Sequence, residues 1–177
     1  SIDDSAITAN NGANASFPAV TQKYGGSLNA YSNSRITLPA MTGLEKASLL
    51  ATGGGQVLAP GVTSFDAVSG TFSWRSTGPG SLIDLSGLTY LEGTDSGSTD
   101  NRYYYVSSIK ADGGGEIDLG GLVSIIDPNS GNTNQRAIDV VSDGTDSLLR
   151  LDSLRQFWVV HEALVFVRSQ LPPADLE

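Results

Sequence analysis

The sequence contains no cysteine and little positive charge, and both absences restrict what the protein does. Without cysteine, neither a disulfide framework nor a thiolate metal site is possible. Lysine and arginine number 10, against 19 aspartates and glutamates, which gives a net charge of −9. Nucleic acids and anionic membranes bind clustered cations, so the composition argues against both as partners. No apolar run approaches the roughly 20 residues of a membrane-spanning helix, and we expect no membrane insertion.

Sustained helical periodicity is lacking as well, whereas glycine is abundant, with 21 residues among 177. This composition is typical of many short strands and turns. We expect one all-β domain over residues 1–177, with repeats over about 7–157 and an irregular terminal coil or cap over 158–171. Residues 172–177 form a tail, whose closing Leu176-Glu177 is typical of an expression vector, and the abrupt start at Ser1 indicates a fragment of a longer protein.

One spacing of apolar residues recurs through the chain. Its clearest copy lies in "GGGEIDLGGLVSII", where it is formed by Ile117, Leu119, Leu122 and Ile125. The same spacing begins at five other positions, one of them a weaker match, which gives six copies: Ala15, Ile36, Val57, Ile83 and Leu149. Repetition at this scale is the signature of a solenoid, in which each repeat buries its apolar face against its neighbours.

A second element precedes each copy and consists of an apolar residue, a variable residue and usually a small one. It begins at Ile7, Leu28, Leu49, Phe72, Ile109 and Ile138, and the first three positions are 21 residues apart. This in-out-in alternation is the signature of a strand. Glycine triplets at 53–55 and 113–115 follow two of these strands, where glycine tolerates the positive φ of a tight corner. A phosphate-binding glycine loop would instead open a helix.

The segments "GSLIDLSGLTYLEG" and "GGGEIDLGGLVSII" resemble the glycine-rich β-solenoid repeats of large bacterial cell-surface and secreted proteins. That group includes filamentous-haemagglutinin-type adhesins and, more distantly, pectin-lyase-like domains. The resemblance implies a single-stranded parallel β-helix with three sides and a right-handed coil. It also implies an extracellular or cell-surface location and a role as a stalk, spacer or display scaffold within a longer chain.

A leucine-rich repeat is the alternative fold, because Ile-x-Leu-x-x-Leu matches part of its signature. The Asn or Cys position of that repeat is missing, since residues such as Met41, Val62 and Leu88 occupy it. We therefore favour the β-helix. It predicts that Ile36 and its equivalents in the later copies share one inward column: Val57, Ile83, Ile117 and Leu149.

Two insertions interrupt the repeat at equivalent places in adjacent copies, after Leu91 and after Ile125. They are expected to lie side by side and to form one surface for binding. Tyrosine rings stack on sugar faces, and amides and carboxylates bind hydroxyls, so a polysaccharide is one candidate ligand and another surface protein is the other. Alternatively, the tyrosines form an additional strand whose rings pack on the side of the solenoid, and the Asp and Asn residues are ordinary turn formers. The candidate binding residues are Arg102, Tyr103, Tyr104, Tyr105, Asp127, Asn129, Asn132 and Arg136, flanked by Asp95, Asp100, Asn101 and Asn134.

An enzyme acting on polysaccharides is a further alternative. Asp84 and Asp118 are outward residues of adjacent copies and are expected to lie about 5 Å apart, a separation seen for paired catalytic carboxylates. Charge compensation by Arg150 explains the same pattern without catalysis. We expect a protein without enzymatic activity and without a cofactor. Calcium is the one ion to consider, because oxygen ligands are frequent in both insertions, although no calcium-binding motif occurs.

Overall fold

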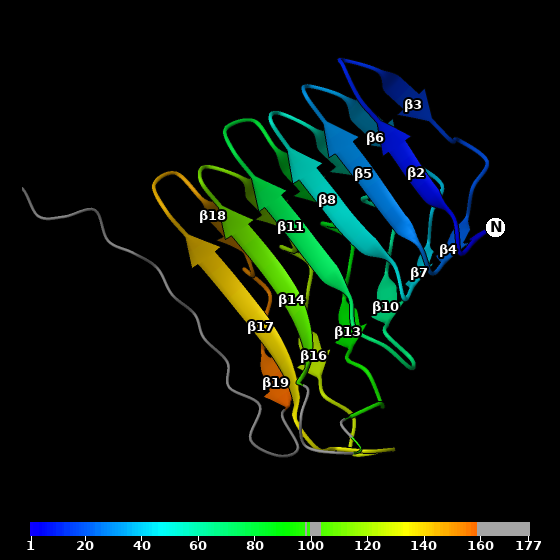
Figure 1. Cartoon of the computed structure of the whole chain (residues 1–177), viewed down its shortest axis with the longest axis vertical. Coiled ribbons are helices and arrows are strands. Elements are labelled where there is room, and N and C mark those ends of the chain that lie inside the picture. The colour runs from blue at the N-terminus through cyan, green and yellow to red at the C-terminus, as the bar shows by residue number, and fades with distance from the viewer. Residues whose placement is uncertain (98, 100–103, 159–177) are drawn as a thin grey trace, which may run out of the picture.

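The computed structural model describes residues 1–97, 99 and 104–158, and in these residues it contains strands but no helix (Figure 1). The strands form three parallel sheets, and the chain visits them in a fixed order. No described segment is a helix long and apolar enough to cross a bilayer. The terminal cap expected over 158–171 lies outside the described residues except for Trp158, which belongs to the last strand.

Each coil of the solenoid contributes one strand to sheet B, then one to sheet C and one to sheet A. Sheet B contains β2 (Ala6–Ala9), β5 (Ser27–Tyr31), β8 (Ser48–Thr52), β11 (Ser73–Thr77), β14 (Tyr105–Asp112) and β17 (Arg136–Asp143). Sheet C contains β3 (Asn14–Ser16), β6 (Arg35–Thr37), β9 (Gln56–Leu58), β12 (Leu82–Asp84), β15 (Glu116–Asp118) and β18 (Leu148–Arg150). Sheet A contains β1 (Ile2–Asp3), β4 (Gln22–Tyr24), β7 (Gly43–Glu45), β10 (Ser64–Asp66), β13 (Tyr90–Glu92), β16 (Ser124–Ile126) and β19 (Gln156–Trp158). Coils 1 to 6 begin at β2, β5, β8, β11, β14 and β17.

The predicted inward column is present in sheet C. Pairing in register joins Ala15, Ile36, Val57, Ile83, Ile117 and Leu149 from one coil to the next. The four central members, from Ile36 to Ile117, are completely buried. The chain is therefore a three-sided parallel β-helix. The leucine-rich-repeat alternative is wrong, because the shared motif is spread over two sheets, with Ile83 in β12 and Leu91 in β13.

In sheet B the expected register is wrong in two coils. Trp74 and Ser76, rather than Phe72 and Trp74, pair with Leu49 and Ala51. In coil 6, Val140 pairs with Ile109, so that Ile138 pairs with Ser107. Phe72 and Ile138 also point inward, because residues two apart in a strand share a face. In these two coils a serine, Ser76 or Ser142, occupies the inward position that is alanine in the neighbouring coil. A search for apolar residues therefore misses this position and assigns the wrong register.

The glycine triplets form corners between sheets B and C, as predicted. Gly113 and Gly114 have φ values of +56° and +88°, and the chain passes directly from β14 to β15. Gly115 has an ordinary φ, but a Cβ on it would lie 2.4 Å from the carbonyl oxygen of Ser76 in the preceding coil. At the next corner, a Cβ on Gly121 would lie 2.4 Å from the carbonyl oxygen of Ser86. Close stacking of coils thus requires glycine at both corners.

A lysine occupies one inward position of sheet A. Lys23 pairs with Ile2 and Leu44 in a column that is otherwise apolar, and it is completely buried. Its ammonium donates hydrogen bonds to the carbonyl oxygens of Ser5 (2.9 Å) and Gly25 (2.7 Å). Burial lowers the pKa of Lys23, while Asp4 and Asp3 oppose that shift. Lys23, and not its neighbour Tyr24, therefore occupies the inward position of β4.

Three aromatic rings fill the core where coil 3 meets coil 4. The centroid of the Phe65 ring lies 4.7 Å from that of Trp74 and 4.6 Å from that of Phe72, both with edge-on geometry. Trp74 is completely buried, and its indole Nε1 donates a hydrogen bond of 3.0 Å to the carbonyl oxygen of Ala47. Trp74 and Phe65 are among the largest fully buried side chains of the described core.

Candidate functional site

The candidate site is built from loops that leave one corner of the solenoid, between sheets A and B. In the early coils this corner is short: residues 25–26 connect β4 to β5, and residues 46–47 connect β7 to β8. Residues 93–104 and 127–135 form the two predicted insertions, and residues 67–72 form a shorter one in the preceding coil. Three consecutive coils therefore carry an excursion at the same corner.

Backbone hydrogen bonds join the three excursions. Asp95 N donates to the carbonyl oxygen of Val68 (2.9 Å), and Asn132 N donates to the carbonyl oxygen of Asp95 (3.0 Å). The contact is close enough that a Cβ on Gly97 would lie 2.3 Å from the carbonyl oxygen of Asn132. The prediction that the two long insertions lie side by side is thus confirmed for their described residues.

Arg136 braces this arrangement from inside. Its side chain is buried, and Nη1 donates to the carbonyl oxygens of Thr94 (2.9 Å) and Ser130 (3.1 Å). Nη2 donates to the carbonyl oxygen of Pro128. Nε lies 3.3 Å from Asp127 Oδ1 at ion-pair distance, without hydrogen-bond geometry. One guanidinium therefore ties both long insertions together.

The prediction that Asp127 and Arg136 offer their side chains to a ligand is wrong, because each residue is only 3% exposed. Burial raises the pKa of Asp127, and the Arg136 guanidinium opposes that shift. The backbone N–H of Asp127 donates to the carbonyl oxygen of Trp158 in the next coil (2.8 Å). A signal was present in the sequence: Arg136 lies an even number of residues before Ile138 and Val140, so alternation places all three on the inward face.

The other candidates divide by exposure. Tyr104 is 73% exposed, and Asn129 and Asn134 are exposed in the neighbouring insertion. Tyr105, Asn132 and Asp95 are half-buried; Tyr105 lies in β14 opposite Arg136, and Asn132 Oδ1 accepts a hydrogen bond from Asn134 N. Asp100, Asn101, Arg102 and Tyr103 lie outside the described residues. Tyr104 is thus the most accessible ring of the described surface.

Asp84 and Asp118 are direct neighbours in sheet C, as the sequence predicts. Each carboxylate accepts a hydrogen bond from the backbone two residues later: Asp84 from Ser86 N (3.0 Å) and Asp118 from Gly120 N (2.9 Å). Arg150 Nε lies 4.0 Å from Asp118 Oδ2 and 2.9 Å from Glu116 Oε1. These contacts account for both aspartates as caps of the turns that follow their strands.

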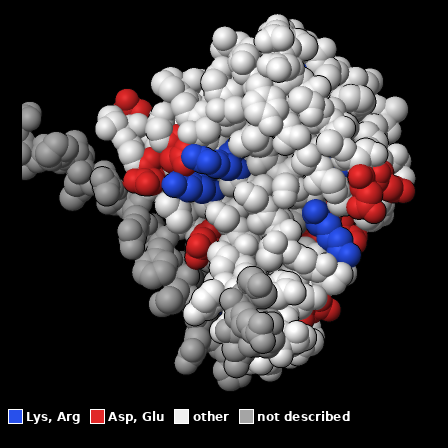
Figure 2. Space-filling view, viewed as in Figure 1, with Lys and Arg blue, Asp and Glu red and all other residues white. Residues whose placement is uncertain are grey.

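A charged cluster on the outer face of sheet B is internally paired (Figure 2). Arg75 Nη2 lies 2.9 Å from Asp112 Oδ2, and Lys110 Nζ lies 3.2 Å from the same atom and 3.8 Å from Asp143 Oδ2. Burial alone would raise the pKa of Asp112, but hydrogen bonds from Thr77, Lys110 and Arg75 hold that pKa below its usual value. The cluster joins three strands and has the charges of a cross-strand network.

Among the described residues, no group of three or more histidine, aspartate or glutamate side chains is placed to hold a metal ion. The described part of the insertions therefore offers no set of acidic ligands for the calcium ion considered above. Compared with protein-family models, with curated proteins and with solved structures, the chain matches none.

Proposed function

We propose that this chain is a non-catalytic structural module of a large extracellular bacterial protein. The solenoid acts as a rigid spacer, and the three excursions form an adhesive surface on its side. The observation that supports the spacer most directly is the continuity of the inward columns, in which equivalent side chains pair from coil 1 to coil 6 without a break. The turn-capping contacts of Asp84 and Asp118 favour a structural role for them over catalysis.

Stretching a single molecule by its ends tests the spacer. Coils that contact only their neighbours are expected to come away one at a time, after resisting extension as intact units. Each step should release a coil of 21 residues or more, which is about 70 Å of chain. Smooth extension at low force, without steps, would show that the module yields under load and would contradict the spacer role.

Binding of carbohydrate is the second candidate function, and the exposure of Tyr104 beside two polar loops favours it. An exposed ring, with exposed amides in the neighbouring insertion, matches the chemistry by which proteins hold neutral sugars. The excursions also present one continuous surface, because they are joined by backbone hydrogen bonds.

A glycan array tests this candidate, with Tyr104→Ala as the informative variant. Loss of the stacked ring is expected to weaken binding of any captured glycan roughly three- to tenfold. Tyr24→Ala is the matched control, since Tyr24 is an exposed tyrosine of β4 in coil 1, away from the excursions. Equal binding by Tyr104→Ala and the unmodified protein would remove the insertion surface as the binding site.

A further inference from the structure

The acidic residues are distributed very unevenly along the solenoid. Residues 1–65 contain three acidic and three basic residues, so the whole net charge of −9 lies after residue 65. Between Asp4 and Glu45 there is no acidic residue at all. Figure 2 shows one face of the molecule, on which the surface over β2 and β5 is free of charged side chains; charged side chains gather over the later coils and also beside the N-terminus. The first coils therefore do not repel anions as the rest of the chain does.

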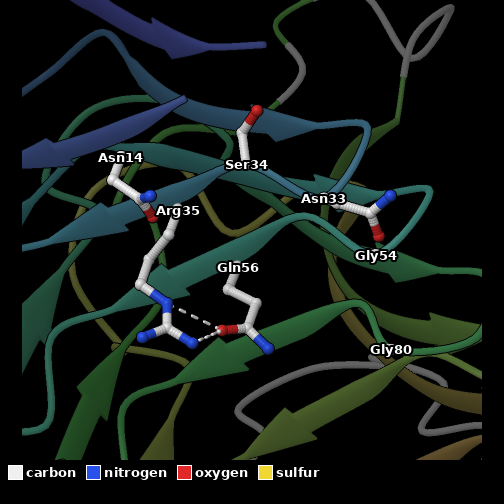
Figure 3. Close-up of a pocket in the computed structure, with 7 residues that line it drawn as sticks. All are labelled: Asn14, Asn33, Ser34, Arg35, Gly54, Gln56 and Gly80. Atoms are coloured by element: carbon white, nitrogen blue, oxygen red, sulfur yellow. Dashed lines mark hydrogen bonds between the residues drawn. The ribbon is translucent and has the colours of Figure 1, made fainter. Parts of the chain in front are cut away.

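A polar depression of about 360 Å³ lies at this neutral end, along the corner between sheets B and C. Asn14, Arg35 and Gln56 reach it from successive strands β3, β6 and β9, where they share one outward column (Figure 3). Asn33 adds a third amide from the corner of coil 2, and a Cβ on Gly54 would lie 2.2 Å from its Oδ1. Glycine at position 54 thus leaves the space that this amide uses.

Arg35 in this depression is held by a neutral partner. Its Nε and Nη2 both donate to Gln56 Oε1, at 3.0 Å and 2.7 Å, so the amide fixes the plane of the guanidinium without compensating its charge. Within the described residues, no carboxylate lies at ion-pair distance from Arg35, and its Nη1 and the Gln56 Nε2 make no hydrogen bond. By contrast, the other arginine of sheet C, Arg150, is paired with Glu116.

One residue that lines the depression, Ser34, carries a buried hydroxyl without a partner. Ser34 is completely buried, and its Oγ has no hydrogen-bond partner. The equivalent hydroxyls of later coils are satisfied: Ser81 Oγ donates to the carbonyl oxygen of Thr77, and Ser147 Oγ donates to that of Asp143. The corner of coil 2 is therefore the least satisfied of the serine corners, and it lies next to the uncompensated arginine.

We propose that this depression is a subsite for an oxyanion carried by an acidic polysaccharide, either a carboxylate or a sulfate ester. Arg35 supplies a planar guanidinium with free N–H groups, which is the donor geometry that carboxylate and sulfate oxygens accept. The amides of Asn14, Asn33 and Gln56 supply donors for the remaining oxygens and the hydroxyls of the sugar. The subsite is separate from the loop excursions, so its failure would leave the spacer role standing.

The test is a binding titration of the whole chain with dextran sulfate, polygalacturonate and uncharged dextran. We expect binding to one or both acidic polymers, none to dextran, and an affinity that falls as salt is added. Arg35→Gln is expected to weaken binding about tenfold, because it removes a charge-assisted contact. The polymer that binds identifies the group: dextran sulfate alone indicates sulfate esters, polygalacturonate alone indicates carboxylates, and both indicate a general oxyanion subsite.

Arg150→Gln is the matched control, since it removes the same charge from the same sheet at an arginine that Glu116 already pairs. Its affinity is expected to stay within about twofold of that of the unmodified chain. Circular dichroism checks that both variants retain the fold. Equal weakening by the two variants would mean that net charge alone governs binding, and absence of binding to both acidic polymers would equally overturn the subsite.

Discussion

Trp74→Ala is expected to lower the free energy of unfolding by about 4 kcal/mol, a typical cost for truncating a large buried aromatic residue. The indole is completely buried, and two phenylalanine rings pack against it at centroid distances of 4.7 Å and 5.1 Å. Removal also leaves the carbonyl oxygen of Ala47 without its indole donor. Denaturant unfolding followed by far-ultraviolet circular dichroism measures the loss as an earlier midpoint.

The other tryptophan provides the comparison. Trp158 is 65% exposed in β19, so Trp158→Ala is expected to change the free energy of unfolding by no more than about 0.5 kcal/mol. Because coils interact only with their neighbours, the transition of Trp74→Ala is also expected to broaden as the coils on its two sides uncouple. An unchanged midpoint for Trp74→Ala would mean that the aromatic cluster does not hold coils 3 and 4 together.

Arg136→Met is expected to cost about 3–5 kcal/mol, because it leaves a buried carboxylate without its partner. Methionine keeps the apolar stem but offers no donor to the carbonyl oxygens of Thr94, Ser130 and Pro128. The excursions should loosen before the coils unfold, since their bracing comes from this side chain. Amide hydrogen exchange of residues 93–97 and 127–135 measures that loosening alongside the unfolding midpoint.

Acidification should partly reverse the effect of Arg136→Met. Burial raises the pKa of Asp127 in the folded state, and the substitution removes the cation that opposes this shift. A carboxyl group whose pKa is raised in the folded state stabilises the fold when it is protonated, and this contribution is lost as the pH rises. The loss of unfolding free energy caused by Arg136→Met should therefore be smaller at about pH 5 than at about pH 7. Arg150→Met, at an exposed ion pair, should change the free energy of unfolding very little. Similar small losses at both arginines would refute the bracing role.

The architecture was predictable because it depends on spacing alone. Ile36 and its equivalents keep the same offsets in every copy, and a repeated offset requires that the side chains stack. The adjacency of the two long insertions followed from the same reasoning, since both leave the chain at equivalent points of consecutive coils. Both the stacking of equivalent residues and the adjacency of the insertions can be predicted from the repeat alone, without any side-chain contact.

The environment of charged residues was less predictable, because it depends on partners that the spacing does not reveal. Arg136 and Asp127 look like surface residues in a polar loop, and only their pairing makes burial tolerable. Lys23 is similar, since its burial depends on two carbonyl oxygens within reach. Arg35 is distinguished by the lack of an acidic partner, because no acidic residue lies between Asp4 and Glu45 in the sequence. A search for motifs does not detect such an absence.

The unequal corners of the coil have a consequence for engineering. Where sheet B turns into sheet C, and where sheet C turns into sheet A, glycines such as Gly115 and Gly121 hold neighbouring backbones too close for a methyl group. The remaining corner already accommodates two residues between coils 2 and 3 and twelve between coils 4 and 5 without disturbing the register of the sheets. Foreign peptides grafted between β7 and β8 would extend the existing row of excursions by one position, which makes this scaffold suited to presenting several epitopes at a fixed spacing.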